Sequence, residues 1–152
     1  MNFSKQQQES FVRLAMEQAE MSIESGCSPF GVVLVDREGK VLVAARNTVT
    51  PETDITQHAE MNLLRVAAEK LGLQKFPECA VFINAASCGM CASALIQAGV
   101  RNFYYGAPFE PHTNPAVSYI QLSQYCKEPL NIYEGILGDE CKAQIERGRK
   151  GK

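Results

Sequence analysis

Three residues with metal-binding side chains and one carboxylate stand at two points of the chain. His58 and Glu60 belong to the segment His-Ala-Glu, and Cys88 and Cys91 are separated by two residues. Two cysteines at this spacing on the first turn of a helix can direct both sulfurs to one metal ion, and a histidine adds a third ligand. Because zinc prefers such nitrogen and sulfur ligands, we expect a zinc site formed by His58, Cys88 and Cys91.

Glu60 lies two residues beyond His58, where it can act beside the metal without binding it. A catalytic zinc keeps its fourth position open and lowers the pKa of water there towards ~7. A neighbouring carboxylate can then serve as the catalytic acid and base. Taken alone, His58 would be a helix-surface histidine, and Cys88 and Cys91 would be buried cysteines or a redox pair. Their combination with Glu60 favours hydrolysis at a zinc centre.

The pattern His-x-Glu followed by Cys-x-x-Cys resembles the signature of the cytidine deaminase-like superfamily of zinc deaminases. Within that superfamily the chain resembles the bacterial guanine deaminases and the tRNA adenosine deaminases. The resemblance implies a three-layer α/β/α sandwich with a central five-stranded mixed sheet, and hydrolytic release of ammonia from a cyclic amidine. Many purine-type members read Thr-x-Glu-Pro before the first of these cysteines. This chain reads Asn-Ala-Ala-Ser at 84–87, so it lacks the usual glutamate and proline.

Hydrophobic spacing and turn residues predict the elements that position these side chains. Thr56 and Ser87 are the candidate N-caps of the two helices that carry the site. The alternation of strands and helices predicts a three-layer α/β domain. The expected helices cover 5–25, 58–71, 88–97 and 115–125, with a last helix that the segment 135–141 leads into, and the expected strands cover 32–35, 40–46, 79–84, 101–105 and 130–133.

Phe30, Asn47 and Ala59 are the candidate substrate contacts. An asparagine at the end of a strand is most often a turn residue. The segment Asn-Thr-Val-Thr that begins at Asn47 nevertheless resembles the guanine deaminases, in which this asparagine binds the base. Phe30 is either a core residue or, as the resemblance implies, one wall of the pocket. Ala59 would offer its backbone N–H at the start of a helix. His112, in the loop after the strand at 101–105, is expected to be solvated rather than catalytic, although a loop at this end of the sheet could still line the pocket.

Three functions are consistent with these residues. Deamination of a free nucleobase or nucleoside comes first, with guanine as the best single choice, because of the segment from Asn47 to His58. The alternative is a tRNA adenosine deaminase, which the sequence from Glu134 to Cys141 and the basic residues at 147–152 favour. A non-catalytic partner subunit with a structural zinc is a third hypothesis. The presence of Glu60 argues against it, because a silent subunit needs no proton shuttle.

Length and composition indicate one domain over residues 1–152, with 147–152 as a frayed basic tail. A net charge of −2 gives no indication of a nucleic-acid or membrane partner. Residues 1–9 are polar and lack the apolar segment of a signal peptide, so we expect a cytoplasmic protein with reduced thiols. The resemblance also implies a homodimer. The four cysteines without metal spacing are expected to be small buried hydrophobic residues: Cys27, Cys79, Cys126 and Cys141.

Overall fold

The computed structural model describes residues 1–151, and these form five helices and five strands. The helices are α1 (Lys5–Glu24), α2 (Ala59–Leu71), α3 (Gly89–Gln97), α4 (Tyr119–Ser123) and α5 (Gly138–Lys150). The strands are β1 (Gly31–Val35), β2 (Val41–Arg46), β3 (Ala80–Ala85), β4 (Asn102–Ala107) and β5 (Asn131–Tyr133).

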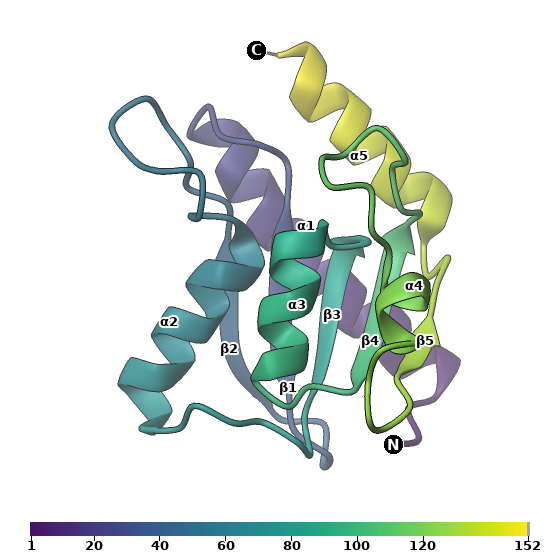
Figure 1. Ribbon diagram of the computed structural model, residues 1–152. Coiled ribbons are helices and arrows are strands. Elements are labelled where there is room, and N and C mark those ends of the chain that lie inside the picture. Colours follow the sequence, from purple (N-terminus) through teal and green to yellow (C-terminus); the bar gives the residue numbers. More distant parts are fainter. Residues whose placement is uncertain (152) are drawn as a thin grey trace.

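The five strands form one mixed sheet in the order β2-β1-β3-β4-β5. β1 is antiparallel to both β2 and β3, whereas β3, β4 and β5 are parallel to one another. The helices lie on both faces of this sheet, with α2 and α3 in front and α1 behind in Figure 1. The predicted three-layer α/β/α sandwich with a five-stranded mixed sheet is therefore confirmed.

Alternate residues of the central strands pack against the two helix layers. In β1, Val32 and Leu34 belong to the cluster that includes Leu63 of α2, whereas Val33 belongs to the cluster that includes Phe11 of α1. Every residue of β1, β3 and β4 is buried. Strands covered on both faces are expected to be continuously apolar, as the run from Val32 to Val35 is.

The beginnings of α2 and α3 lie at the same end of the sheet, where β3 ends. α3 follows β3 through a short loop, and α2 follows the long loop after β2. In Figure 1 the C-terminal part of α5 extends past this same end of the sheet. Among residues 1–151, no helix is long and apolar enough to cross a membrane.

Four local predictions from the sequence were wrong. The N-cap of α2 is His58 rather than Thr56, whose hydroxyl bonds Asp54 instead. The N-cap of α3 is Cys88 rather than Ser87. The helix expected at 115–125 is confined to Tyr119–Ser123, where Ser118 and Gln121 form a capping box. Residues 147–150 are helical rather than frayed, because Arg147 pairs with Glu20 and Arg149 with Glu110; Lys152 lies outside the described residues.

Candidate active site

The three expected metal ligands meet where α2 and α3 begin. His58 caps α2, Cys88 caps α3, and Cys91 lies in the first turn of α3. Nδ1 of His58 is 3.6 Å from Sγ of Cys88 and 3.4 Å from Sγ of Cys91. All three ligand atoms lie within 4.8 Å of one another. The fold therefore gathers residues that are 30 and 33 positions apart in the sequence.

The spacing of these atoms fits a tetrahedral zinc. With Zn–N near 2.1 Å and Zn–S near 2.3 Å, tetrahedral geometry separates nitrogen from sulfur by about 3.6 Å. The two observed separations are 3.6 and 3.4 Å. One imidazole and two sulfurs also form the donor set that zinc prefers. His58, Cys88 and Cys91 are therefore suited to hold zinc with one position left open.

The electrostatics of the cluster favour a thiolate on Cys88. A hydrogen bond from Cys91, and a weaker one from His58, lower the pKa of Cys88 to about 4. The same interaction with Cys88 raises the pKa of Cys91, and the pKa of His58 is raised chiefly by its hydrogen bond to Cys88. Because zinc binds the deprotonated forms of its ligands, the lowered pKa of Cys88 is compatible with metal binding at this position.

Glu60 is a buried carboxyl group in the first turn of α2, with 6% of its surface exposed. Its Oε2 accepts a 2.5 Å hydrogen bond from the Ser87 hydroxyl, which in turn accepts one from the Tyr119 hydroxyl. Burial raises the pKa of Glu60, and the bond from Ser87 opposes that shift in part. A carboxyl group tuned upward in this way suits proton transfer near neutral pH.

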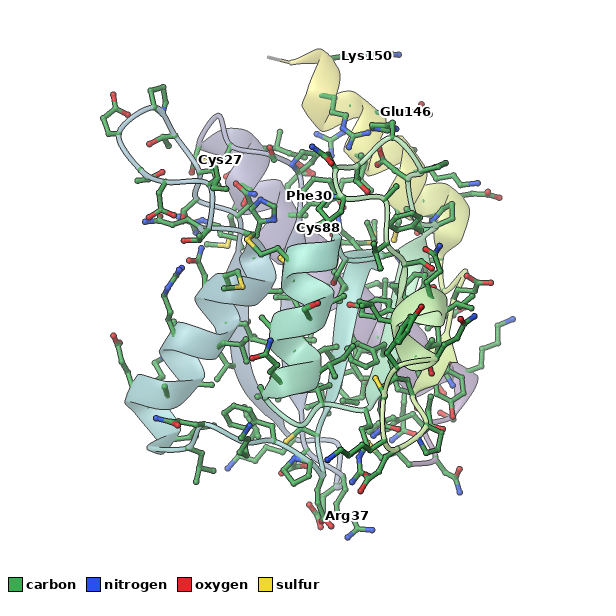
Figure 2. The ribbon with its side chains drawn as sticks, in the orientation of Figure 1. Cys27, Phe30, Arg37, Cys88, Glu146 and Lys150 are labelled. Carbon is green, nitrogen blue, oxygen red and sulfur yellow. The ribbon has the colours of Figure 1, made fainter. Side chains whose placement is uncertain are left out.

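A cavity of about 180 Å³ opens beside these groups. Pockets that enclose drug-sized ligands usually measure 300–1,000 Å³, so this one suits a single small ring system. Figure 2 labels Cys88 at the start of α3 and Phe30 near it, and both line the cavity. Its lining consists of Ser28, Phe30, Asn47, His58, Ala59, Glu60, Ala85, Ala86, Ser87, Cys88, Phe109, Glu110, His112, Thr113 and Arg149.

Asn47 combines the two roles considered from the sequence. Its Oδ1 accepts a 3.0 Å hydrogen bond from the backbone N–H of Val49, which is turn chemistry. Its backbone carbonyl accepts a 2.7 Å bond from the hydroxyl of Ser22. Its side chain nevertheless lines the cavity, and within residues 1–151 its Nδ2 has no hydrogen-bond partner. Asn47 therefore offers a bound base the donor Nδ2, while its Oδ1 already accepts one hydrogen bond from the fold.

Phe30 and Ala59, the other expected substrate contacts, also line the cavity. The Phe30 ring lies 5.8 Å below the guanidinium carbon of Arg149 and packs partly against both core clusters. Both sequence-based interpretations of Phe30, as core residue and as pocket wall, are therefore compatible with its position.

Two charged residues of the cavity were missed from the sequence. Arg149 of α5 forms a 2.9 Å ion pair with Oε1 of Glu110, in the loop after β4. Oε2 of Glu110 is buried and accepts no hydrogen bond in the described chain, although Nε2 of His112 lies 2.9 Å away. His112 is exposed, as expected, yet it lines the cavity. The place of that loop at one end of the sheet was a signal that it could line the pocket, but no local pattern pointed to Arg149.

Fold and site together define a class: an α/β protein with a potential zinc site and a buried carboxylate on one cavity wall. Comparison with protein families agrees with this class. Residues 5–107 match the family model described as the cytidine and deoxycytidylate deaminase zinc-binding region. The chain belongs to this family and is a hydrolytic zinc deaminase.

The relatives include tRNA adenosine deaminases and guanine deaminases. The tRNA-specific adenosine deaminase of Agrobacterium fabrum is 32% identical over 139 residues, which cover 90% of each chain. The guanine deaminase of Bacillus subtilis is 31% identical over 79% of this chain and 75% of its own. A solved structure from a study of A-to-I editing by tRNA:A34 deaminases superimposes with a TM-score of 0.80 at 30% identity, over 90% of this chain and 99% of that one.

Proposed function

We propose that the protein hydrolytically deaminates a purine base held in the cavity, with Glu60 as the proton shuttle. The observation that carries this proposal is the position of Glu60, buried on a cavity wall that it shares with His58 and Cys88. We assign His58, Cys88 and Cys91 as the zinc ligands. When bound there, zinc acidifies water and so provides a nucleophile at neutral pH.

Glu60 performs the proton transfers that such a deamination needs. Its carboxylate accepts a proton from the attacking water and passes it to the ring nitrogen beside the reacting carbon. It then protonates the exocyclic amine, which leaves as ammonia while the ring carbon becomes a carbonyl. Nδ2 of Asn47 donates a hydrogen bond to an acceptor on the base, and Phe30 forms an apolar wall.

Adenosine in tRNA is the first candidate substrate. Similarity supports it better than guanine, which the sequence alone had favoured, because the relative from Agrobacterium fabrum matches 90% of both chains. The small cavity is compatible with this substrate, since deaminases that act on nucleic acids take one base out of its stack and enclose it.

Guanine is the second candidate, and Glu110 is the observation that favours it. Glu110 lines the cavity, and its carboxylate is complementary to a base with donors, such as guanine with the amino group on its N2 position. The two arginines in the last turn of α5, Arg147 and Arg149, are paired with carboxylates, which reduces the positive charge left for phosphate groups.

Ammonia release from tRNA, adenosine and guanine distinguishes these candidates. The zinc-loaded protein is assayed on each, together with Glu110→Gln, which keeps the shape of the side chain and removes its charge. The leading candidate predicts turnover of tRNA and little effect of Glu110→Gln. The second predicts turnover of guanine and a loss of kcat/KM in the variant. Absence of ammonia release from tRNA, adenosine and guanine alike contradicts the proposal.

The resemblance also leads us to propose a single domain, a homodimer and a cytoplasmic location. Light scattering during size-exclusion chromatography tests the homodimer, for which the expected mass is twice the 16.7 kDa of the chain.

A further inference from the structure

A buried chain of hydrogen bonds leads from α4 to the carboxyl group of Glu60. The hydroxyl of Tyr119 donates to Oγ of Ser87, and Ser87 donates to Oε2 of Glu60 over 2.5 Å. Tyr119 and Ser87 are each 1% exposed, and Glu60 is 6% exposed. Water therefore has little access to this chain, and each member depends on its neighbour for its hydrogen bond.

The direction of the chain follows from the chemistry of its members. A serine hydroxyl has one hydrogen, so Ser87 can donate to Glu60 only if it accepts from Tyr119. Burial raises the pKa of Tyr119, which keeps its phenol protonated and able to donate. Both hydroxyl groups therefore direct their hydrogens towards one carboxylate oxygen, and hydrogen bonds aligned in this way strengthen one another.

This arrangement fixes Oε2 of Glu60. Tyr119 is itself held by aromatic contacts, with its ring centroid 4.3 Å from that of Phe103 and 5.8 Å from that of Tyr105. Ser87 directly precedes Cys88, so its backbone is fixed by the start of α3. A proline at position 87, which many purine-type deaminases have, provides no hydroxyl group for Glu60.

We propose that Ser87 and Tyr119 are positioning residues that fix Oε2 of Glu60 and so orient its carboxylate for proton exchange with substrate. This inference rests on the proposed role of Glu60 as the proton shuttle. Tyr119 acts through Ser87 and does not line the cavity, whereas Ser87 does.

Four zinc-loaded variants test the positioning role by their kcat, KM, zinc content and urea unfolding. Ser87→Ala should lower kcat about 10–150-fold, the value of a hydrogen bond to a charged group, with little change in KM. Tyr119→Phe should lower kcat about 2–10-fold, the value of a neutral hydrogen bond. Ser87→Thr keeps the hydroxyl and should stay within about threefold of the unmodified protein.

The double variant Ser87→Ala/Tyr119→Phe separates positioning from simple stabilisation. Ser87→Ala leaves the Tyr119 hydroxyl buried without an acceptor, and removing that hydroxyl should restore part of the lost stability. The kcat of the double variant should nevertheless stay as low as that of Ser87→Ala, because Tyr119 acts only through Ser87. Recovery of kcat together with stability would overturn the positioning role.

Tyr105→Phe is the matched control. The Tyr105 hydroxyl also donates to a carboxylate, that of Glu134 at 3.1 Å, but not to Ser87 or Glu60, and phenylalanine keeps the ring that contacts Tyr119. Loss of the Tyr105 hydroxyl should leave kcat unchanged. An equal fall in kcat for Tyr105→Phe and Tyr119→Phe would show a general effect of buried tyrosines and would overturn the inference.

A measurement independent of turnover examines the row of hydrogen bonds from Tyr119 through Ser87 to Glu60. The hydroxyl proton of Tyr119 should give a slowly exchanging proton NMR signal that disappears in Tyr119→Phe and shifts in Glu60→Gln. A signal that Glu60→Gln leaves unmoved contradicts the coupling. If Glu60→Gln retains turnover of tRNA or guanine, the proposed function fails. If it is inactive while the Ser87 and Tyr119 variants work normally, only the present inference fails.

Discussion

At the scale of single residues, one side chain of the site can both stabilise the fold and face the cavity. Asn47 shows both roles within one amide group. Its Oδ1 bonds the backbone of Val49, and its Nδ2 remains available to a ligand. A turn residue and a substrate contact are therefore not exclusive alternatives at this position.

These two roles predict different effects for two substitutions of Asn47. Asn47→Asp keeps the oxygen that bonds Val49 and removes the donor, so kcat/KM should fall by the ~1–3 kcal/mol of an unpaired buried group, with little change in melting temperature. Asn47→Ala should lower both kcat/KM and melting temperature. Steady-state kinetics and thermal unfolding of the two variants provide the test. Normal kinetics for Asn47→Asp would show that Asn47 has only a structural role in the turn.

At the scale of elements, the helix starts show why part of the site was predictable. His58, Glu60, Cys88 and Cys91 lie within two short segments, so their spacing alone indicated a shared metal and a neighbouring carboxylate. The caps were mispredicted because capping preferences describe local hydrogen bonds. Here His58 and Cys88 occupy the N-caps without making side-chain capping bonds, and their side chains face each other instead.

Contacts between distant segments could not be predicted from local patterns. Ser87 meets Glu60 across 27 residues and Tyr119 across 32, and Arg149 near the C-terminus reaches Glu110 in the loop after β4. Charged residues near a terminus are usually solvated, which is why 147–152 was expected to be frayed. The ion pairs of Arg147 and Arg149 depend on where α5 packs, and local sequence carries no information on that position.

The contact of α1 with β1 yields a prediction at this scale. A Cβ on Gly31 would lie 2.1 Å from the backbone oxygen of Ala15 and 2.6 Å from the backbone nitrogen of Ala19. Gly31→Ala should therefore force the helix from the sheet and lower the free energy of unfolding by at least the ~1–3 kcal/mol of core overpacking. Gly138→Ala is the control, since its Cβ would meet only Gly106 O at 3.4 Å. Urea unfolding compares them, and equal stabilities would contradict this packing.

At the scale of the whole molecule, the potential zinc site joins two helices that belong to different parts of the chain. α2 follows the β1–β2 hairpin and α3 follows β3, and both pack on the same face of the sheet. Zinc bound by His58, Cys88 and Cys91 would hold these helix starts together in the folded protein only. Metal binding should therefore contribute to stability as well as to catalysis.

Removal of zinc should lower the melting temperature. A ligand present at 100 times its Kd stabilises a fold by about 2.7 kcal/mol, which corresponds to about 5–10 °C for a chain of this length. Differential scanning calorimetry with and without a chelator measures the shift. A Cys88→Ser/Cys91→Ser variant should show no further shift on chelation, and a full shift in that variant would place the metal elsewhere.

The central claim is that Glu60 transfers protons beside a zinc held by His58, Cys88 and Cys91. The most direct test measures ammonia release by Glu60→Gln after its zinc content and fold have been verified. Glutamine preserves the shape of the side chain but cannot shuttle a proton, so turnover should fall by at least the ~10²–10⁴-fold typical of acid–base catalysis while zinc stays bound. Turnover close to that of the unmodified protein, with zinc fully bound, would contradict the account.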